Sequence, residues 1–534
     1  MTDRTSFNAS EITFDVIIIG AGINGAGIAR DAAMRGLKVL LLDKGDIGSG
    51  TSSWSTRLIH GGLRYLEHGE FGLVRESLRE REVLLTIAPH LVRPLPIVIP
   101  IYENARRGLW TIRTGMIAYD ALSLGKTLPR HRILSRAEAL QQEPGLNPEG
   151  LNGAAVYYDA QVEFAERLVL ENVLSATAHG AIALTYARVT DFLFADGAIP
   201  GVNFTNELNE EKLSARARII VNAAGPWVDR VLGQSAASSP RLIGGTKGSH
   251  IIVASFPGAP SRALYTEAET DRRPFFIIPW NGQYLIGTTD VRYNDDLDRV
   301  QIDPDEIDYL LRETNRLFPH ANLTREGILY TYSGVRPLPF TEDKNERSIT
   351  RRHFIREHPR WQNVLSIVGG KLTTYRSLAE QAVDLIVKKL GRGPSECTTA
   401  KVPLPGAGPD LNTIEREFKE SGTFSPLVSE RLVRIYGTRA TELCELVSQD
   451  ASLGETFNRE GDAIAAEVVF SFTQEMAATL ADCLLRRTMV GLNPSRGVGD
   501  DLAAAQIALK HLGWSESRAQ DELENYRKEV QRQG

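Results

Sequence analysis

A short apolar run that ends in a glycine-rich turn constrains the fold more than any other part of this sequence. Residues 16–19 are all apolar, and Gly20, Gly22 and Gly25 follow with the spacing G-x-G-x-x-G. This pattern predicts a buried parallel strand that turns directly into a helix. The first glycine permits the tight turn, the second lets the backbone approach a pyrophosphate, and the third lets the helix pack closely on the sheet. We therefore expect a dinucleotide-binding unit here.

A second apolar run supplies the acidic residue that such a unit requires. Residues 39–42 are apolar and Asp43 follows them, about twenty residues after the first glycine, where a carboxylate binds a ribose hydroxyl. The N-terminus of the intervening helix offers N–H groups and a partial positive charge to the phosphates. We assign cofactor contacts in this region to Gly20, Gly22, Asn24, Gly25 and Asp43.

Length and composition limit the remaining choices. A chain of 534 residues exceeds one hydrophobic core, so two or three structural units are expected. The net charge of −6 argues against nucleic acid as the main partner. Three cysteines without metal-ligand or redox spacing predict buried thiols in a reducing compartment and no metal site. Residues 1–11 lack the apolar core of a signal peptide, so we expect a cytoplasmic protein.

The next segments predict a loop, a helix and a strand. Thr51, Ser52 and Ser53 suit a backbone that wraps a phosphate and a flat ring, although a solvated loop is an equal alternative. Helical spacing continues from 71 to 88 and ends before a proline. Three prolines within residues 91–101 predict an edge strand, because proline cannot donate to a neighbouring strand.

Residues 106–122 combine a helical apolar stripe with three arginines and a tryptophan. A helix that packs against the core is the usual explanation of such a stripe. Basic residues beside Trp110 also suit a helix that lies in a bilayer surface. Both interpretations remain open from the pattern.

The second half repeats the opening theme and then changes character. Residues 218–222 are mostly apolar and lead into Ala223 and Gly225, which predicts a second strand–turn at the cofactor, although an ordinary loop fits as well. Short strands between residues 241 and 290 predict an antiparallel sheet that walls a substrate cavity.

Three basic clusters stand out against the acidic total, at residues 246–250, 333–338 and 368–376. Arginine and lysine beside glycine turns are suited to an anionic substrate. Each cluster alone is more often a solvated surface charge, so only convergence in one pocket would make them functional. His250 is the natural general base, with a structural histidine as the competing interpretation.

The motifs together resemble the FAD-dependent glycerol-3-phosphate dehydrogenases. They are G-A-G-I-N-G-A-G-I-A, T-S-S-x-S-T-R-L-I-H-G-G-L-R-Y-L-E, K-G-S-H, G-T-T-D, Y-S-G-V-R-P-L and G-G-K-L-T-T-Y-R, in this order within residues 14–382. The resemblance implies noncovalent FAD and oxidation of sn-glycerol 3-phosphate to dihydroxyacetone phosphate by hydride transfer from C2 to flavin N5. It also implies a membrane quinone as electron acceptor, helix 106–122 at the bilayer surface, and peripheral attachment to the inner face of the cell membrane.

The resemblance also implies roles for individual residues. Around the substrate it places Arg64, Tyr65, His250, Arg336, Arg351 and Lys371. Along the flavin and its ribityl chain it places Gly369, Gly370, Leu372 and Thr373. We expect the arginines to hold the phosphate, and His250 or Lys371 to accept the C2 hydroxyl proton, with His250 preferred as base. Relatives often carry Lys where this chain has Arg57, and Arg167 receives no role because the sequence around it departs from the family pattern.

The fold class we expect is α/β, with a glutathione-reductase-type FAD-binding domain, an antiparallel-sheet substrate domain and a C-terminal helical cap. The FAD-binding domain is expected from residues 14–90, 157–240 and 345–395. The substrate domain is expected from residues 91–156 and 241–344, and the cap from residues 403–534. Packing and oligomer contact, as in a homodimer, are the default roles of the cap.

Three alternatives differ in function. A glycerol-3-phosphate oxidase would perform the same half-reaction with oxygen as acceptor. A dehydrogenase of another polyol phosphate would use the same cofactor and basic clusters. A non-catalytic nucleotide-binding protein would keep the glycine turn but would not need the basic clusters.

Overall fold

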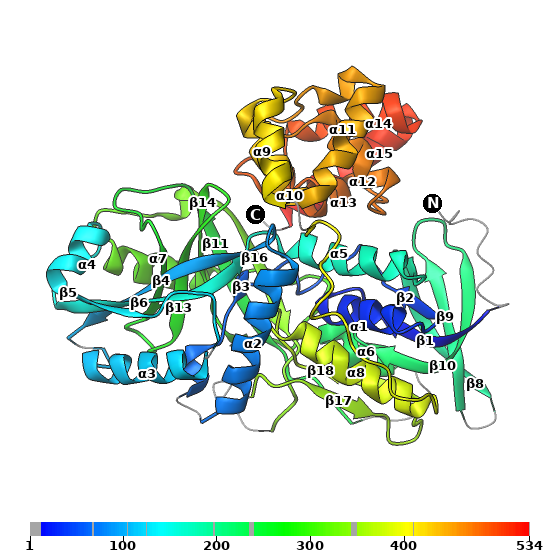
Figure 1. The fold of residues 1–534 in the computed structure, drawn as a ribbon, viewed down its shortest axis with the longest axis horizontal. Coiled ribbons are helices and arrows are strands. Elements are labelled where there is room, and N and C mark those ends of the chain that lie inside the picture. The colour runs from blue at the N-terminus through cyan, green and yellow to red at the C-terminus, as the bar shows by residue number, and fades with distance from the viewer. Residues whose placement is uncertain are drawn as a thin grey trace.

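The computed structural model describes residues 12–66, 69–103, 105–123, 125–195, 198–233, 240–342, 350–408 and 411–532. Figure 1 shows three parts: a sheet covered by helices, a second sheet beside it, and a helical domain above the junction of the two. The predicted α/β architecture with a separate sheet and a helical cap is therefore confirmed.

The first sheet holds the glycine turn at the end of its central strand. Its order is β17-β18-β10-β1-β2-β7, with β1 paired in parallel to β2 and β10. The strands are β1 Thr13–Ile19, β2 Val39–Leu42, β7 Ile182–Leu184, β8 Ala187–Ala195, β9 Ala198–Asn206, β10 Lys212–Asn222, β17 Phe354–Glu357 and β18 Val364–Val368. Helices α1 (Ile23–Met34), α5 (Ala165–Ala178) and α8 (Tyr375–Lys389) pack together against it. Because both faces of β1 are covered, residues 16–19 at its end are continuously apolar.

The second sheet is largely antiparallel, as predicted. Its order is β15-β11-β14-β13-β12-β4-β6-β3, with β16 paired to β11 and β5 to β6. The strands are β3 Leu58–Ile59, β4 Val92–Tyr102, β5 Arg132–Ser135, β6 Leu151–Val162, β11 Thr246–Val253, β12 Ala263–Glu267, β13 Pro274–Trp280, β14 Gln283–Gly287, β15 Val291–Arg292 and β16 Ile328–Arg336. Helix α7 (Pro304–Leu317) covers part of it and begins at a capping box formed by Asp303 and Glu306.

The prediction that residues 91–101 form an edge strand is wrong. Strand β4 lies between β6 and β12, with β6 along almost its whole length. It pairs with β12 only at Ile97 and Val98, between Pro96 and Pro100. The prolines are tolerated because the second partner contacts β4 only where amide donors are present.

The segment predicted as a helix at 106–122 forms α3, Leu109–Leu122. One face packs on the second sheet through Ile112, Met116 and Tyr119, so the core-facing interpretation is confirmed. Trp110 is nevertheless 75% exposed and Ile117 55% exposed on the other face. The remaining helices of the two lower parts are α2 Phe71–Ile87, α4 Arg136–Gln142 and α6 Val228–Leu232.

The C-terminal domain consists of helices. Its residues from 463 onward form an apolar core of their own, whereas Phe418, Val428 and Leu432 belong to the core that includes the second sheet. They are α9 Leu411–Ser421, α10 Pro426–Tyr436, α11 Ala440–Gln449, α12 Ala465–Thr473, α13 Leu480–Arg486, α14 Asp500–Leu512 and α15 Glu516–Gln531. We call this domain the cap. It lies over α5 and the end of the second sheet in Figure 1, so it contacts both lower parts of the molecule.

Candidate functional site

The glycine turn after β1 has the geometry that the sequence predicts for close backbone approach. Gly20 has φ 106°, and a Cβ atom there would lie 2.7 Å from the carbonyl oxygen of Ala223 at the end of β10. A Cβ on Gly25 would lie 1.8 Å from the carbonyl oxygen of Gly20. Gly22 is the N-cap residue of α1 and has no side chain to occupy the space in front of the helix. A side chain at Gly20 or Gly25 would therefore close the turn or push α1 off the sheet.

Asp43 lies directly beside this turn. Its carboxylate accepts hydrogen bonds from the amides of Ala21, at 2.6 Å, and Gly45, at 2.9 Å. Burial raises the pKa of Asp43 to about 6. The predicted ribose-binding carboxylate is thus brought next to the predicted phosphate-binding turn, although the two are separated by the whole of α1.

Three hydroxyl residues hold the following loop against the same turn. The Ser52 hydroxyl accepts a hydrogen bond from the amide of Ile23 at 3.0 Å, at the first turn of α1. Thr51 donates to the carbonyl of Val335 in β16 at 2.8 Å, and Ser53 donates to the carbonyl of Gly48 at 2.7 Å. The loop therefore connects the glycine turn to the second sheet.

A glycine pair from another part of the chain lies beside the first turn of α1. Gly369 and Gly370 have φ 79° and 96° and follow β18. The Asn24 side-chain amide donates to the Gly369 carbonyl at 3.3 Å, whereas its buried Oδ1 atom has no hydrogen-bond partner among the described residues. Thr373, just after the pair, accepts a hydrogen bond from the amide of His60 at 3.1 Å. Leu372 packs against the hydrophobic core that includes α1, α5 and α8. Gly225 begins the short turn that follows β10.

Three arginines converge on one carboxylate at the edge of the second sheet. Arg336 lies 3.0 Å and Arg351 3.3 Å from Asp290, and Arg273 lies 4.0 Å from it and also donates to its backbone carbonyl. Burial alone would raise the pKa of Asp290, but the guanidinium groups, with that of Arg336 first, hold it below its usual value. Arg273 also lies 3.4 Å from Asp271, so three guanidinium groups face two carboxylates and the surplus positive charge can receive an anion. We call these residues the Asp290 cluster.

Lys371 and Tyr65 lie next to this cluster. The Lys371 ammonium lies 4.0 Å from the centre of the Tyr65 ring and donates to the Ser77 hydroxyl at 3.3 Å. Burial lowers the pKa of Lys371, and Arg351 lowers it further. Tyr65 also acts electrostatically on Arg336. The described residues of two predicted basic clusters thus meet at one place; the side chain of Arg64 lies outside the described part of the structure.

His250 is buried near the Asp290 cluster. Its Nε2 atom lies 3.0 Å from the hydroxyl of Thr56, and its ring lies 4.8 Å from that of Tyr332. A Cβ on Gly287, its partner in β14, would lie 2.5 Å from the imidazole, so the glycine makes room for the ring. Burial, together with the charges of Arg336 and Arg57, places the pKa of His250 well below 6.5. The imidazole is therefore neutral at pH 7.

Sequence reasoning missed four residues at this site. Asp290 and Arg273 complete the cluster, and Thr288 accepts a hydrogen bond from Arg336 at 2.8 Å. His60 is half-buried: its amide donates to Thr373, its ring lies 6.3 Å from that of Phe276, and desolvation lowers its pKa to about 4. The motif G-T-T-D contained Thr288 and Asp290, but nothing in it indicated which arginines would come close.

Arg57, at which relatives often carry lysine, has a structural role here. Both oxygens of Glu166 lie 2.7 Å from its guanidinium, which also lies 4.5 Å from the Trp280 ring centre. The pair is fully buried. A planar fork can make this two-point contact and an ammonium cannot, so arginine is favoured over lysine at this position.

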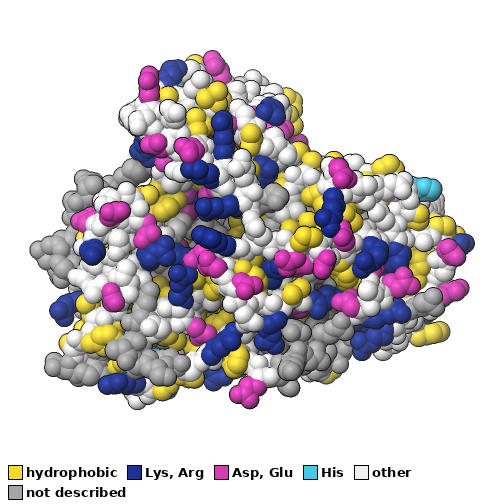
Figure 2. Space-filling view, turned by 180° about the vertical axis from the view of Figure 1, so that it is seen from behind, with side chains coloured by type: hydrophobic (Ala, Val, Ile, Leu, Met, Phe, Trp, Pro, Cys, Tyr) yellow, Lys and Arg dark blue, Asp and Glu magenta, His cyan; other side chains and the backbone are white. Residues whose placement is uncertain are grey.

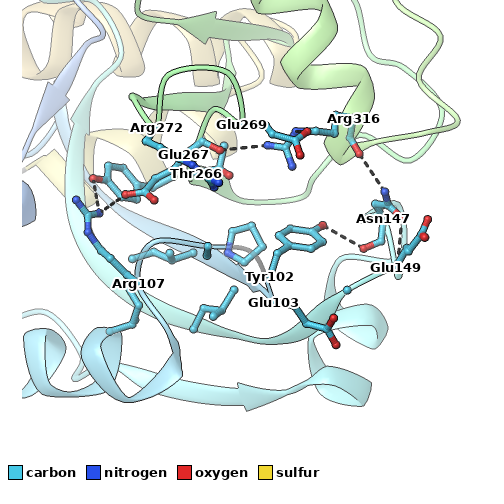
Figure 3. Close-up of a pocket in the computed structure, with 17 residues that line it drawn as sticks. Tyr102, Glu103, Arg107, Asn147, Glu149, Thr266, Glu267, Glu269, Arg272 and Arg316 are labelled. Carbon is cyan, nitrogen blue, oxygen red and sulfur yellow. Dashed lines mark hydrogen bonds and ion pairs between the residues drawn. The ribbon is translucent and has the colours of Figure 1, made fainter.

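A separate cavity of about 340 Å³ lies between α3 and the strands β4 and β12. Figure 3 shows the Arg107–Glu267 ion pair at one end of it and the hydrogen bond from Tyr102 to Asn147 at the other. None of the predicted site residues lines it. Figure 2 shows the back of the molecule, where Lys and Arg side chains are interspersed with Asp and Glu.

Comparisons with known proteins extend over nearly the whole chain. The family described as FAD dependent oxidoreductase matches residues 15–376, and the C-terminal domain of alpha-glycerophosphate oxidase matches residues 397–519. A glycerol-3-phosphate dehydrogenase of Synechocystis is 48% identical over 96% of this chain and 95% of its own length. A D-erythritol 1-phosphate dehydrogenase of Brucella abortus is 40% identical over 89% of this chain and 94% of its own length. The FAD complex of a Bacillus halodurans glycerol-3-phosphate dehydrogenase has a TM-score of 0.80 at 28% identity, covering 98% of this chain and 96% of that one.

Proposed function

Because the chain belongs to the family of FAD-dependent glycerol-3-phosphate dehydrogenases, we propose that it oxidises sn-glycerol 3-phosphate to dihydroxyacetone phosphate and delivers the electrons to a membrane quinone. The observation that carries the proposal is the Asp290 cluster. Three guanidinium groups share one carboxylate there, beside Lys371 and close to residues of the glycine turns. This arrangement provides charge for a phosphate next to a dinucleotide site.

FAD is the cofactor of this chain, and the described residues fit it. Gly20, Gly22 and the first turn of α1 would hold the pyrophosphate, and Asp43 the ribose. The unpartnered Asn24 oxygen and the Gly369–Gly370 turn would lie along the flavin half. When bound, FAD supplies a two-electron acceptor for the hydrogen on C2 of the substrate.

The arginines anchor the substrate at its unreactive end. Arg336 and Arg351 can exchange part of their contact with Asp290 for the phosphate oxygens, which form charge-assisted hydrogen bonds to guanidinium groups. Fixing the phosphate orients the C2 hydroxyl without any contact to the carbon skeleton. The same anchoring disfavours unphosphorylated glycerol, because glycerol cannot form the charge-assisted hydrogen bonds to these half-buried arginines.

We assign the proton transfer to His250. A neutral imidazole can accept the proton of the C2 hydroxyl, directly or through Thr56, whereas Lys371 remains protonated and stabilises negative charge. Replacing His250 by Asn should lower the rate of the reductive half-reaction by roughly 10²- to 10⁴-fold. The acid limb of the pH–rate profile, expected below pH 6.5, should disappear. An unchanged profile would contradict the assignment.

We further propose that α3 places the molecule on the bilayer that contains the quinone. No helix among the described residues is long and apolar enough to cross a membrane. Trp110 and Ile117 project from α3, and Arg113 lies 5.5 Å from the Trp110 ring. Such a face suits the interface of an anionic membrane. Glutamate at both apolar positions should abolish co-sedimentation with anionic vesicles without changing dye-linked activity.

The identity of the substrate and that of the acceptor are tested separately. Anaerobic addition of sn-glycerol 3-phosphate should bleach the visible flavin spectrum, and D-erythritol 1-phosphate is the competing substrate because a 40% identical relative is named for it. The match of residues 397–519 to an oxidase domain makes oxygen the competing acceptor. Stoichiometric peroxide in air would support the oxidase, and quinone reduction without peroxide would support the dehydrogenase.

A further inference from the structure

The cap makes a buried polar contact with the loop that carries the cofactor residues. Asp46, three residues beyond Asp43, is fully buried. Its carboxylate lies 2.6 Å from Nε of Arg486, and 2.9 and 2.7 Å from the two terminal nitrogens of Arg487. Both arginines lie at the end of α13, more than 400 residues away along the chain. A loop of the FAD site is therefore held by the last domain of the protein.

The positive charges at this contact are fully compensated. Arg486 also binds Asp482 at 2.8 Å and lies 3.4 Å from Glu529, so three carboxylates face two guanidinium groups. The hydroxyl of Tyr186 donates to Asp482 at 2.7 Å, and the amide of Tyr186 donates to the carbonyl of Gly45 at 3.0 Å. The cap thus holds the loop through Asp46 and, by way of Tyr186, through the residue before it. We call Asp46, Asp482, Arg486 and Arg487 the Asp46 cluster.

Hydrogen bonds continue from Asp46 to the glycine turn. The carbonyl of Asp46 accepts a bond from the hydroxyl of Ser49 at 2.8 Å. The amide of Gly48 donates to the carbonyl of Ala21 within the turn at 3.0 Å, and Ser53 donates to the carbonyl of Gly48. Displacing Asp46 would therefore displace the loop at the points where it meets the predicted pyrophosphate and ribose sites.

We propose that Arg486 and Arg487 are positioning residues for the FAD site: by holding Asp46 they keep residues 43–53 in the conformation that binds FAD. Docking of the cap and binding of FAD then favour each other, and the coupling acts equally in both directions. This gives the cap a function beyond packing. The proposal rests on FAD as cofactor and is independent of the substrate and of the electron acceptor.

A matched contact separates positioning from stability. Arg167 of α5 binds Glu475 of the cap at 2.6 and 2.8 Å, and both side chains are fully buried. This pair joins the same two parts of the molecule as the Asp46 cluster. It contacts α5 instead of the loop 43–53. It meets Arg487 only through backbone carbonyls: Arg487 donates from Nε to the Glu475 carbonyl at 2.7 Å, and Arg167 lies 3.5 Å from the Arg487 carbonyl. Arg167→Gln therefore leaves the contact of Arg487 with Asp46 in place. If the cap contributed only stability, loss of either contact would affect FAD binding alike.

The test compares FAD affinity in the full-length variants Asp46→Asn, Arg487→Gln and Arg167→Gln. Apoprotein is titrated with FAD and binding is followed by flavin fluorescence at a temperature at which circular dichroism shows each variant folded. Asp46→Asn and Arg487→Gln should raise the FAD dissociation constant roughly tenfold or more, and Arg167→Gln should leave it close to the wild-type value. Wild-type affinity in the first two variants, or an equal loss in all three, would overturn the proposal.

The wild-type protein provides a second test that needs no variant. Hydrogen exchange is measured on the full chain with and without FAD. FAD should slow the exchange of amides in α13, although that helix belongs to the cap, because binding and cap docking are coupled. Unchanged exchange in α13, together with slowed exchange in the loop 43–53, would overturn the proposal even if the variants failed to fold.

Discussion

The Asp290 cluster and the Asp46 cluster use the same two side-chain types for opposite purposes. At Asp290, three arginines share one carboxylate, and the side chains of Arg336 and Arg351 are 23% and 14% exposed. In the Asp46 cluster, two arginines meet two aspartates, and none of these four side chains is more than 4% exposed; Glu529 also lies 3.4 Å from Arg486. A buried charge must be paired to be tolerated. The surplus positive charge at the Asp290 cluster therefore suits a mobile anion, whereas the Asp46 cluster, which has no such surplus, joins two domains.

The largest effect on stability is expected at the Asp46 cluster. Asp46→Asn removes the one carboxylate that both buried guanidinium groups bind, which should lower the free energy of unfolding by about 3–5 kcal/mol. Chemical denaturation of the FAD-free protein measures this. The exposed carboxylate of Asp305 in α7 provides a control, since Asp305→Asn should change stability little. A decrease in the free energy of unfolding of less than about 1 kcal/mol would show that the Asp46 cluster is not a structural contact.

The next largest effect is expected on catalysis at the Asp290 cluster. Arg336→Met should lower kcat/KM for sn-glycerol 3-phosphate, because the phosphate loses a charged partner. The loss corresponds to about 2–5 kcal/mol of transition-state free energy. Steady-state kinetics with an artificial electron acceptor measure it. Arg312→Met, at an exposed arginine of α7, is the control and should leave the rate unchanged. Equal kinetics in both variants would remove the distinction between the clusters.

A smaller effect is expected at Asp290 itself, where a substitution should strengthen phosphate binding instead of weakening it. Its carboxylate competes with the phosphate for the guanidinium groups, so Asp290→Asn should tighten competitive inhibition by inorganic phosphate, by roughly three- to tenfold. The inhibition constant measures this directly. Weaker inhibition would mean that Asp290 mainly orients its arginines, in the way that Arg486 and Arg487 hold Asp46.

The smallest effect is expected in the acid dependence of stability. Burial alone would raise the pKa of Asp46, but Arg487 and Arg486 lower it, so the folded protein holds the carboxylate ionised below the usual pH. The stabilisation is fully present above about pH 4 and is lost as the pH falls, amounting to under about 1 kcal/mol between pH 5 and 3.5. Asp46→Asn should lose this component. An identical acid dependence in both proteins would contradict the pKa direction.

Local sequence signals were sufficient for the first strand–turn–helix unit and for the helical cap. The geometry at Gly20, Gly22 and Gly25 depends on absent side chains, which a sequence displays directly. Strand β4 shows the limit of this reasoning. Its prolines indicated an edge strand, but the outcome depended on how short the pairing with β12 is. The length of a partner strand is a property of the whole sheet.

Arg167 and Asp46 show the same limit for charged residues. The ion-pair partners of both residues lie far away in the sequence, and Arg167 had no predicted role. Each is bound by a cap residue more than 300 positions away. A buried ion pair of this kind leaves no local pattern, because its two halves obey no fixed spacing.

By itself the sequence determined the dinucleotide turn, the helix within residues 106–122 and the helical character of the C-terminal domain. These follow from backbone conformation and apolar periodicity, which act over a few residues. Only the tertiary structure decided which arginines meet at Asp290, which ones neutralise Asp46, and that the cap reaches the cofactor loop. Electrostatic pairing acts across space, so the role of a charged side chain is set by its neighbours in the fold.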